Sequence, residues 1–170
     1  MNVYDAIRTK RAIREFQDRP LPDELVHQIL NAGRLSQSSK NTQPWQFIAV
    51  RDRAKLEALS KTGTWAGHLA KAALGVAILT PDPTEKFQTM FDAGQAAAYM
   101  QLAAWELGVG SCLASIYEAE PARAILGFPP EWHLRIAISF GYPTPEALQP
   151  RPPRPEGRKG FDEVAHWDEW

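Results

Sequence analysis

The stretch FQTMFDAGQAAAYMQLAAWELG, residues 87–108, carries the longest helical pattern in the chain. Apolar and small residues recur there at helical spacing, which predicts a helix from about Glu85 to Leu107, with Gly108 as its C-terminal stop. Residues 93–98 have almost only small side chains. Such a surface allows another backbone to approach closely, at a central or an intersubunit contact, but the same residues also simply favour helix formation. Both interpretations stay open.

Short apolar segments on both sides of this helix are typical of strands. Residues 45–50 alternate in polarity, 74–79 form a short apolar run, and 112–116 and 134–140 look like two further strands. In the last of these, the large apolar residues are expected to share one face: Leu134, Ile136, Ile138 and Phe140.

Shorter helices are predicted around these strands. Asn2 is a good N-cap for a first helix, Pro22 begins a second that ends near Leu35, and Asp52 can cap a third. Residues 122–127 make a brief fourth helix between two strands. Successive strands are not regularly separated by single crossover helices, so we predict an α+β fold rather than a doubly wound parallel sheet.

Length and composition favour one domain, because 170 residues with 44% hydrophobic content can bury one sizeable core. We take residues 1–142 as the folded part and 143–170 as an extended C-terminal arm of the same domain. Six prolines in residues 143–155 deny that stretch regular hydrogen bonding. The tail beyond them carries Trp167 and Trp170, and we expect it to bury either on its own domain or on a second subunit.

The charge balance excludes a general attraction to nucleic acid or to an anionic membrane. Nineteen Lys plus Arg against twenty Asp plus Glu leave a net charge of −1. Residues 1–5 lack the blocks of a secretory signal, and the apolar runs are too short to span a bilayer, so we expect a cytoplasmic protein. Cys112, the only cysteine, suits a reducing compartment and is expected to be a core residue. The histidines show no metal-ligand spacing, so no metal site is expected.

Two polar segments carry candidate binding chemistry. Lys10, Arg11 and Arg14 place three cations within five positions, as a dianionic phosphate requires, although a basic helix end also complements its own dipole. Residues 38–43 have short polar side chains that can hydrogen-bond a heterocycle, although turn-forming residues also make ordinary loops. Trp65 and His68 are a weaker candidate for the border of a substrate pocket, because surface packing is the simpler interpretation.

Together, at this spacing, the two polar segments resemble the nitroreductase family of FMN-dependent oxidoreductases. The family pattern Arg-Arg-Ser-x-Arg-x-Phe appears in residues 10–16 as KRAIREF, and Pro-Ser-x-x-Asn-x-Gln-Pro-Trp appears in residues 37–45 as QSSKNTQPW. The resemblance continues through Asp92 to LGVGSC at 107–112, and it closes with RKGFDEVAHWD at 158–168, which is similar to the terminal arm of the family. It covers nearly the whole chain.

The resemblance implies a role for each matched position. The FMN phosphate is expected to pair with a group of cations: Lys10, Arg11, Arg158 and Lys159. Arg14 is expected to face the pyrimidine edge of the flavin, where a cation favours the reduced ring. The ribityl chain and polar ring atoms are expected to meet short polar side chains of the other subunit: Ser38, Ser39, Asn41 and Gln43. The N5 side is expected to face backbone groups of one strand: Leu113, Ala114 and Ser115.

The resemblance also implies a nitroreductase-like fold, with a mostly antiparallel central sheet flanked by helices. The C-terminal arm is then exchanged in a homodimer that has its FMN sites at the subunit interface. Four departures stand beside this match. Ala12 replaces the usual Ser, so only its backbone can serve the cofactor, while Gln37 replaces Pro and Leu113 stands where Trp is common. The long insertion that many members carry before the central helix is missing, so we expect a more open or differently covered pocket.

The implied activity is that of an oxidoreductase which uses NAD(P)H as a transient donor to reduce nitroaromatic, quinone or similar electron-poor acceptors. Two hydride transfers would pass through flavin N5, and no side chain need act as a nucleophile because the flavin carries the redox chemistry. The chain has no Gly-x-Gly-x-x-Gly after a strand, which agrees with a transient nicotinamide. The missing insertion leaves open a specialised flavin reaction such as dehalogenation, flavin cleavage or heterocycle oxidation, and Ala12 leaves open a non-catalytic flavin-binding module.

Overall fold

Four strands form one antiparallel sheet in the computed structural model, which describes residues 1–149 and 157–170. The strands are β1 (Gln46–Val50), β2 (Leu74–Thr80), β3 (Gly110–Ser115) and β4 (His133–Gly141). They lie in the order β1-β2-β4-β3, and each neighbouring pair is antiparallel. The predicted α+β fold is confirmed, and β1 and β3 are the edge strands of the sheet.

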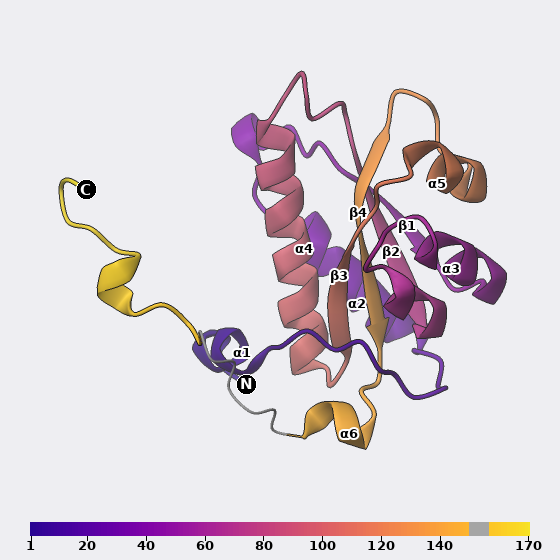
Figure 1. Ribbon diagram of the computed structural model, residues 1–170, viewed down its shortest axis with the longest axis horizontal. Helices are drawn as coiled ribbons and strands as arrows, with labels where there is room; N and C mark the ends of the chain where they lie inside the picture. Colours follow the sequence, from indigo (N-terminus) through magenta and orange to yellow (C-terminus); the bar gives the residue numbers. More distant parts are fainter. Residues whose placement is uncertain (150–156) are drawn as a thin grey trace.

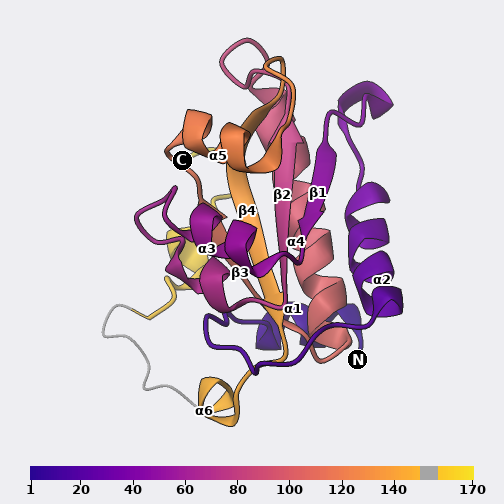
Figure 2. The same ribbon diagram turned by 90° about the vertical axis from the view of Figure 1, so that its right-hand side faces the viewer.

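Helices cover both faces of this sheet (Figures 1 and 2). One face carries α2 (Asp23–Arg34) and α4 (Gln88–Glu106), and the other carries α3 (Arg53–Ser60) and α5 (Ala119–Leu126). Because successive side chains of a strand point to opposite faces, β2 supplies two separate cores. Val76 and Ile78 pack with α2 and α4, whereas Ala77 and Leu79 pack with α3 and α5.

The ends of the helices follow from local sequence, as predicted. Asn2 caps α1 (Val3–Thr9) because its side-chain oxygen accepts the N–H of Asp5 at 2.8 Å. Asp52 caps α3 in the same way. Gly108 follows α4 with φ of +74°, a conformation that glycine adopts at little cost.

One prediction about β4 is wrong. Ile78 pairs with Ile136 and Leu79 pairs with Leu134, so the register shifts by one residue at Arg135. An extra residue of this kind reverses which face the following side chains take. Leu134 therefore packs in the core of α3 and α5, whereas Ile138 packs in the core of α2 and α4. Alternation in the sequence cannot reveal such a bulge.

The small residues of α4 allow close packing at a central position, which was one of the interpretations that the sequence left open. Ala93, Ala96 and Ala97 are buried, so they let α4 pack closely within its own chain. Gly94 and Ala98 face outward and line an apolar groove of about 290 Å³, together with exposed Leu113 and other residues of α4 and β4. This groove is a surface on which a second backbone can approach α4.

An extended N-terminal segment, residues 10–16, runs beside the sheet after α1. Ala12 forms a parallel bridge with Ser111 at the start of β3, and Ile13 N donates to Ser111 O at 3.0 Å. The side chain of Ile13 is fully buried. A Cβ at Gly110 would lie 2.8 Å from Ile13, so only glycine permits this close approach. The cations of this segment are thus fixed against β3 by packing within one chain.

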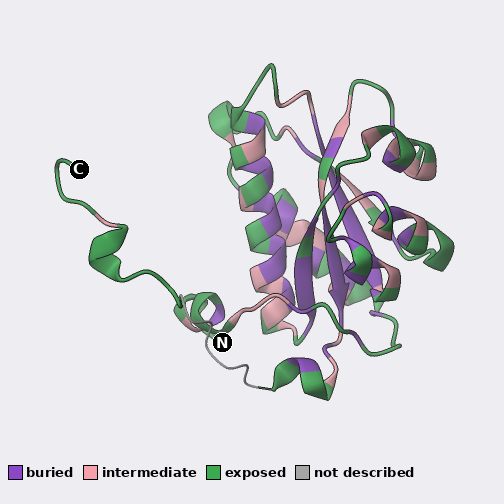
Figure 3. Cartoon of the chain, viewed as in Figure 1, coloured by how far each residue is buried: buried purple, intermediate pink, exposed green. Residues whose placement is uncertain are grey.

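The described part of the C-terminal arm, residues 157–170, leaves the body of the molecule (Figure 1). It includes the short turn η3 (Phe161–Glu163), and its side chains are almost all exposed (Figure 3). Trp167 is 80% exposed and Trp170 is 100% exposed. The tail therefore does not bury on its own domain, and residues 150–156 of the proline-rich stretch lie outside the described residues. In the described ranges, the structure contains no helix with the length and apolar character needed to cross a bilayer.

Candidate cofactor site

Lys10 and Arg14 lie on the same side of the extended N-terminal segment and act on the same strand. Burial raises the pKa of the Cys112 thiol on β3, while the charges of Arg14 and Lys10 oppose that rise. Burial lowers the pKa of the Lys10 ammonium group, and Cys112 opposes this shift. A half-buried cation and an exposed one therefore flank β3, where no carboxylate is recorded as an ion-pair partner for either within the described residues. This is a locally positive surface on a chain of nearly zero net charge.

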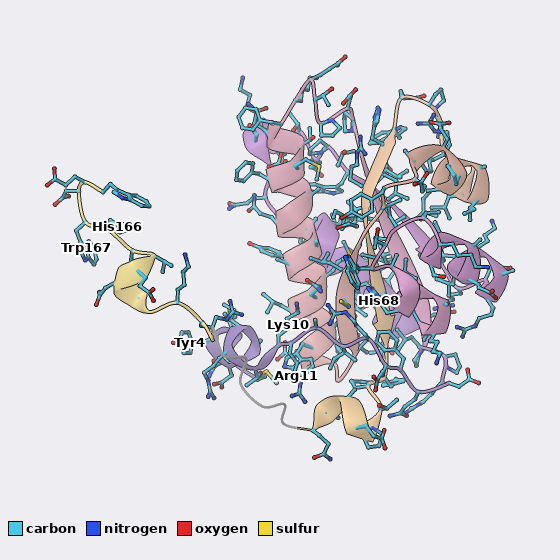
Figure 4. The ribbon with its side chains drawn as sticks, in the orientation of Figure 1. Tyr4, Lys10, Arg11, His68, His166 and Trp167 are labelled. Atoms are coloured by element: carbon cyan, nitrogen blue, oxygen red, sulfur yellow. The ribbon has the colours of Figure 1, made fainter. Side chains whose placement is uncertain are left out.

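Arg11 points elsewhere, because alternate residues of an extended segment face opposite ways. Its guanidinium donates to the carbonyl oxygens of Leu148 and Gln149, at the end of α6 (Pro145–Leu148). Figure 4 shows Lys10 and Arg11 just after α1, in the segment that runs from this helix toward the sheet. The structure thus places Lys10 and Arg14 on one side of the segment. Arg11 lies on the other side, where two of its N–H groups bind the end of α6.

The outer edge of β3 offers backbone groups beside these cations. Leu113 is 46% exposed and Ser115 is exposed, whereas Ala114 is buried. After the bridge at Ser111, no strand of the described chain lies along this edge. Outward N–H and C=O groups of an edge strand need partners, so they are available to a planar ligand.

His68 lies in the same region, although its sequence context indicated only a weak candidate for a pocket border. It belongs to η2 (Gly67–Lys71), is 8% exposed, and places Nδ1 2.7 Å from Ser139 Oγ on β4. Ser139 Oγ lies 3.3 Å from the carbonyl oxygen of Cys112. The Nε2 atom of His68 is buried and has no hydrogen-bond partner in the described structure. Burial lowers the pKa of His68, the charge of Arg14 lowers it further, and the Leu113 carbonyl opposes both.

The polar loop of residues 38–43 is held by a buried carboxylate that sequence reasoning had not given a role. Both oxygens of Asp92 on α4 accept the N–H of Ser39, at 3.2 and 3.3 Å, and Asp92 is only 5% exposed. Ser38 Oγ accepts the N–H of Gln43 at 2.9 Å. Asn41 and Gln43 have positive φ angles of 54° and 47°, which non-glycine residues seldom adopt. Backbone conformations of this kind persist only where surrounding contacts hold them, and they are frequent at binding sites.

Within one chain, this loop and the cations lie at opposite ends of α4 (Figures 1 and 2). The loop contacts Asp92 near the start of the helix, whereas Trp105 near its end donates to Thr9, next to Lys10. The two positions are separated by about 20 Å along the helix at 1.5 Å per residue. One copy therefore does not bring all the predicted cofactor residues together.

The remaining predicted residues divide in the same way. Ala12 lies half-buried in the extended segment, with its backbone bridged to Ser111. Arg158 and Lys159 are exposed on the C-terminal arm, at the start of its described part. Figure 4 shows the arm, with His166 and Trp167, lying apart from Lys10 and His68.

Trp65 stands exposed beside the end of β3 rather than packed on the surface. Its segment is fixed because Thr62 O accepts the N–H groups of Tyr117 and Glu118 at 2.9 and 3.0 Å. Trp65 is 79% exposed and Tyr117 is 59% exposed. Two aromatic side chains thus extend from segments that meet just beyond the open edge of β3.

A model of the nitroreductase family matches residues 7–74 and 62–142, which together make up most of the chain. The protein belongs to the nitroreductase family. A relative from Archaeoglobus fulgidus, provisionally named NADH dehydrogenase/NAD(P)H nitroreductase, is 34% identical over 147 residues, or 82% of this chain and 84% of the relative. Residues 10–16 and 37–45, which carried the resemblance, lie inside the matched region, whereas residues 158–168 lie beyond it.

Solved structures of the family share the fold from end to end. An FMN-dependent nitroreductase from Clostridium difficile is 28% identical, covers 97% of this chain and 98% of its own, and has a TM-score of 0.81. A protein from Bacteroides thetaiotaomicron, provisionally named NADH dehydrogenase/NAD(P)H nitroreductase, is 25% identical over 99% of this chain and 98% of its own, with a TM-score of 0.85. The predicted family and fold are confirmed, and the names of these relatives agree with the prediction of an NAD(P)H-dependent oxidoreductase.

Proposed function

We propose that this nitroreductase-family protein binds FMN and uses NAD(P)H to reduce nitroaromatic, quinone or similar electron-poor acceptors. The observation that carries the proposal is the position of Lys10 and Arg14 beside the open edge of β3. A phosphate requires local cations, and a flavin ring requires donors and acceptors along one edge. The buried, unpartnered Nε2 of His68 in the same region fits a site that takes a polar ligand.

Each cation among the predicted cofactor residues has a proposed role. Lys10 pairs with the phosphate, and Arg14 lies at the pyrimidine edge, where its charge stabilises the reduced ring. Arg11 retains N–H groups beyond its two carbonyl bonds, since a guanidinium has five donors, but its side chain must turn from α6 to bring them to the phosphate. Arg158 and Lys159 add charge to a phosphate when their arm is docked. Bound flavin supplies the hydride chemistry, while the chain positions the ring, provides charge and excludes water.

The complete site requires two copies of the chain. Because the loop of residues 38–43 lies about 20 Å from the cations along α4, a second copy must supply it to the first. The groove beside Gly94 and Ala98 is the proposed contact between copies, since its small residues permit close approach. Exposed Trp167 and Trp170 then bury on the partner, as large aromatic residues do at interfaces.

Trp65 and Tyr117 are proposed to border the acceptor pocket. They project beside the β3 edge that faces flavin N5 in this proposal, and the family's long insertion is missing here. Flat, electron-poor rings stack well on aromatic side chains, so this border favours nitroaromatic or quinone acceptors. Replacement of Trp65 by Ala is expected to raise the KM for the acceptor more than that for NAD(P)H.

The function is tested with purified protein reconstituted with FMN. We expect a flavin absorption band, anaerobic bleaching by NADH or NADPH, and its return on addition of menadione or a nitrobenzene. Protein that binds no FMN at excess would overturn the proposal, and bound flavin that neither nicotinamide reduces would leave only a flavin-binding module.

The shared site is tested by complementation between two defective chains. Arg14→Ala removes the cation side of both sites in a homodimer, and Asn41→Ala removes a loop contact from both. A mixed dimer of the two variants contains one site with both parts intact. We expect it to recover up to half of the wild-type FMN binding. If mixed dimers bind no more FMN than either homodimer, the two halves of the site do not come from different copies.

A further inference from the structure

His68 is a buried polar residue that none of the proposed cofactor contacts explains. It is 8% exposed, and its Nε2 atom has no hydrogen-bond partner in the described structure. A buried polar atom without a partner costs about 1–3 kcal/mol. A fold that retains such an atom beside its proposed cofactor site is expected to use it.

One ring nitrogen of His68 has a hydrogen-bond partner and the other does not. Ser139 Oγ lies 2.7 Å from His68 Nδ1 and 3.3 Å from the Cys112 carbonyl oxygen. When the Ser139 hydroxyl donates to this carbonyl, Nδ1–H of His68 donates to Ser139 Oγ. In neutral imidazole this leaves a lone pair on Nε2. His68 can therefore bind a proton at Nε2 without breaking either hydrogen bond.

The charged groups around this ring come from several elements. Arg14, in the extended segment, is the charge that acts directly on His68, and together with Lys10 it acts on Cys112 of β3. β4 contributes the neutral hydroxyl of Ser139. From α3, the Arg53 guanidinium binds the carbonyl oxygens of residues 70 and 72, at the far end of η2. The Leu113 carbonyl of β3 favours the charged ring, whereas burial and the charge of Arg14, which have larger effects, favour neutral His68.

We propose that His68 is a proton-binding partner of the flavin, neutral beside the oxidised ring and charged at Nε2 beside the reduced ring. This rests on the proposed function, because Arg14 must face both the flavin and His68. A bound flavin that has accepted a hydride would carry one more negative charge near Arg14 than the oxidised flavin. That charge offsets the field of Arg14 at His68, and the ring takes one proton from solvent.

The proton balance of the full reaction shows why a residue that binds and releases one proton, as proposed for His68, is useful. NAD(P)H supplies a hydride in the first half-reaction, and His68 stores one solvent proton. In the second half-reaction a quinone takes the hydride and one further proton to become the hydroquinone. His68 releases its proton as the flavin is oxidised, so the site returns to its first state. His68 acts here as a positioning residue for charge, since its effect on the flavin passes through Arg14.

The test measures the protonation of His68 in both redox states of the holoprotein. The four histidines are labelled with ¹³C at the ring Cε1, and their NMR signals are followed against pH in oxidised and anaerobically reduced protein. His68→Gln, or His68→Asn if the first variant does not fold, assigns the signal. If neither folds, the Gln variants of His27, His133 and His166 assign it by elimination.

We expect the proton affinity of His68 to be about tenfold higher in reduced than in oxidised holoprotein, a shift of about one pH unit. Exposed His27 on α2 is the matched control, and its NMR signal should not differ between the two redox states. In Arg14→Gln protein the shared cation is gone, so His68 should bind its proton more tightly in the oxidised state than it does in wild type.

Two results would overturn the inference. One is a His68 signal with the same midpoint in both states, and the other is a ring that stays neutral in both states across the folded range. Either result with bound, reducible flavin rejects the role of His68 alone. Protein that binds no flavin rejects the proposed function and this inference with it.

Discussion

The extended N-terminal segment and the C-terminal arm are both proposed to bring cations to one phosphate, yet only the first is fixed by its own chain. Ile13 is fully buried between Lys10 and Arg14, and its backbone bonds to Ser111. On the arm, Trp170 is completely exposed, and the hydrogen bonds of the described part stay within the arm. Half of the proposed site therefore belongs to the fold of one chain, and half depends on association.

This difference has an energetic cause. Full burial of a side chain such as Ile13 contributes about 1.5–3 kcal/mol, which offsets the entropy lost on ordering the extended segment. The arm gains no such burial in the single chain, and only a partner surface can supply it. Substitutions in the arm should consequently change the affinity of the two subunits for each other. Substitutions in the extended segment should instead change the affinity for the cofactor.

Deletion of residues 161–170 is expected to have the largest effect. It removes two exposed tryptophans, and interface residues of this type often contribute about 2 kcal/mol or more each, so the dimer should weaken by at least 4 kcal/mol. Sedimentation over a range of concentrations measures the change. A matched variant that replaces Ala98 in the groove of α4 by Glu tests the groove without touching the arm. Unchanged sedimentation of the truncated chain would contradict the exchange of the arm.

Lys10→Ala is expected to weaken FMN binding by about 1.5–3 kcal/mol, because a hydrogen bond to a charged group is lost. The affinity for riboflavin, which has no phosphate, should change little. Lys61→Ala removes a surface cation of an ion pair on α3 and serves as the control. Equal losses for FMN and riboflavin would show that Lys10 supports the fold rather than the phosphate.

Asp92→Ala should cost about 1–3 kcal/mol of stability, since the N–H of Ser39 loses its acceptors. It should also release the strained loop and reduce FMN affinity. Asp52→Ala is the matched control, because it also removes a carboxylate that accepts a backbone N–H, but on α3. Thermal unfolding and FMN titration of both variants separate the two effects, and an Asp92 variant with normal FMN affinity would exclude a role for this contact in the loop.

The smallest expected effect concerns Cys112. Burial raises the pKa of its thiol, so at neutral pH it should react with a thiol reagent at least tenfold more slowly than in the unfolded chain. The neutral thiol also contributes to the free energy of unfolding. Because the folded-state pKa of Cys112 is raised, this contribution is fully present below the unfolded-state pKa and is lost as pH rises through the folded-state pKa. Relative to Cys112→Ser, the wild type should therefore lose stability at alkaline pH. Rapid labelling at pH 7 would contradict the buried position.

Local signals allowed much of the fold to be predicted. Helix caps at Asn2 and Asp52, the stop at Gly108 and the alternating strands depend on neighbours within a few residues, so the sequence displays them directly. The bulge at Arg135 escaped prediction because it depends on pairing between β2 and β4, which are far apart along the chain.

The candidate site was harder to predict. Lys10 and Arg14 were identified by their pattern, and the structure places both beside β3, which their spacing alone does not show. Asp92 was recognised only as part of a pattern, and its hold on Ser39 spans 53 residues of sequence. The buried contact between His68 and Ser139 spans 71 residues and has no local signature.

By itself, the sequence determined the class of fold and the family, because periodicity, helix caps and short motifs are read from near neighbours. Tertiary structure alone decided that Lys10 and Arg14 share one side while Arg11 turns to α6. It also decided that the polar loop lies at the far end of α4 and that His68 is buried with a free nitrogen. These features depend on which distant segments pack together, and that is a property of the folded chain as a whole.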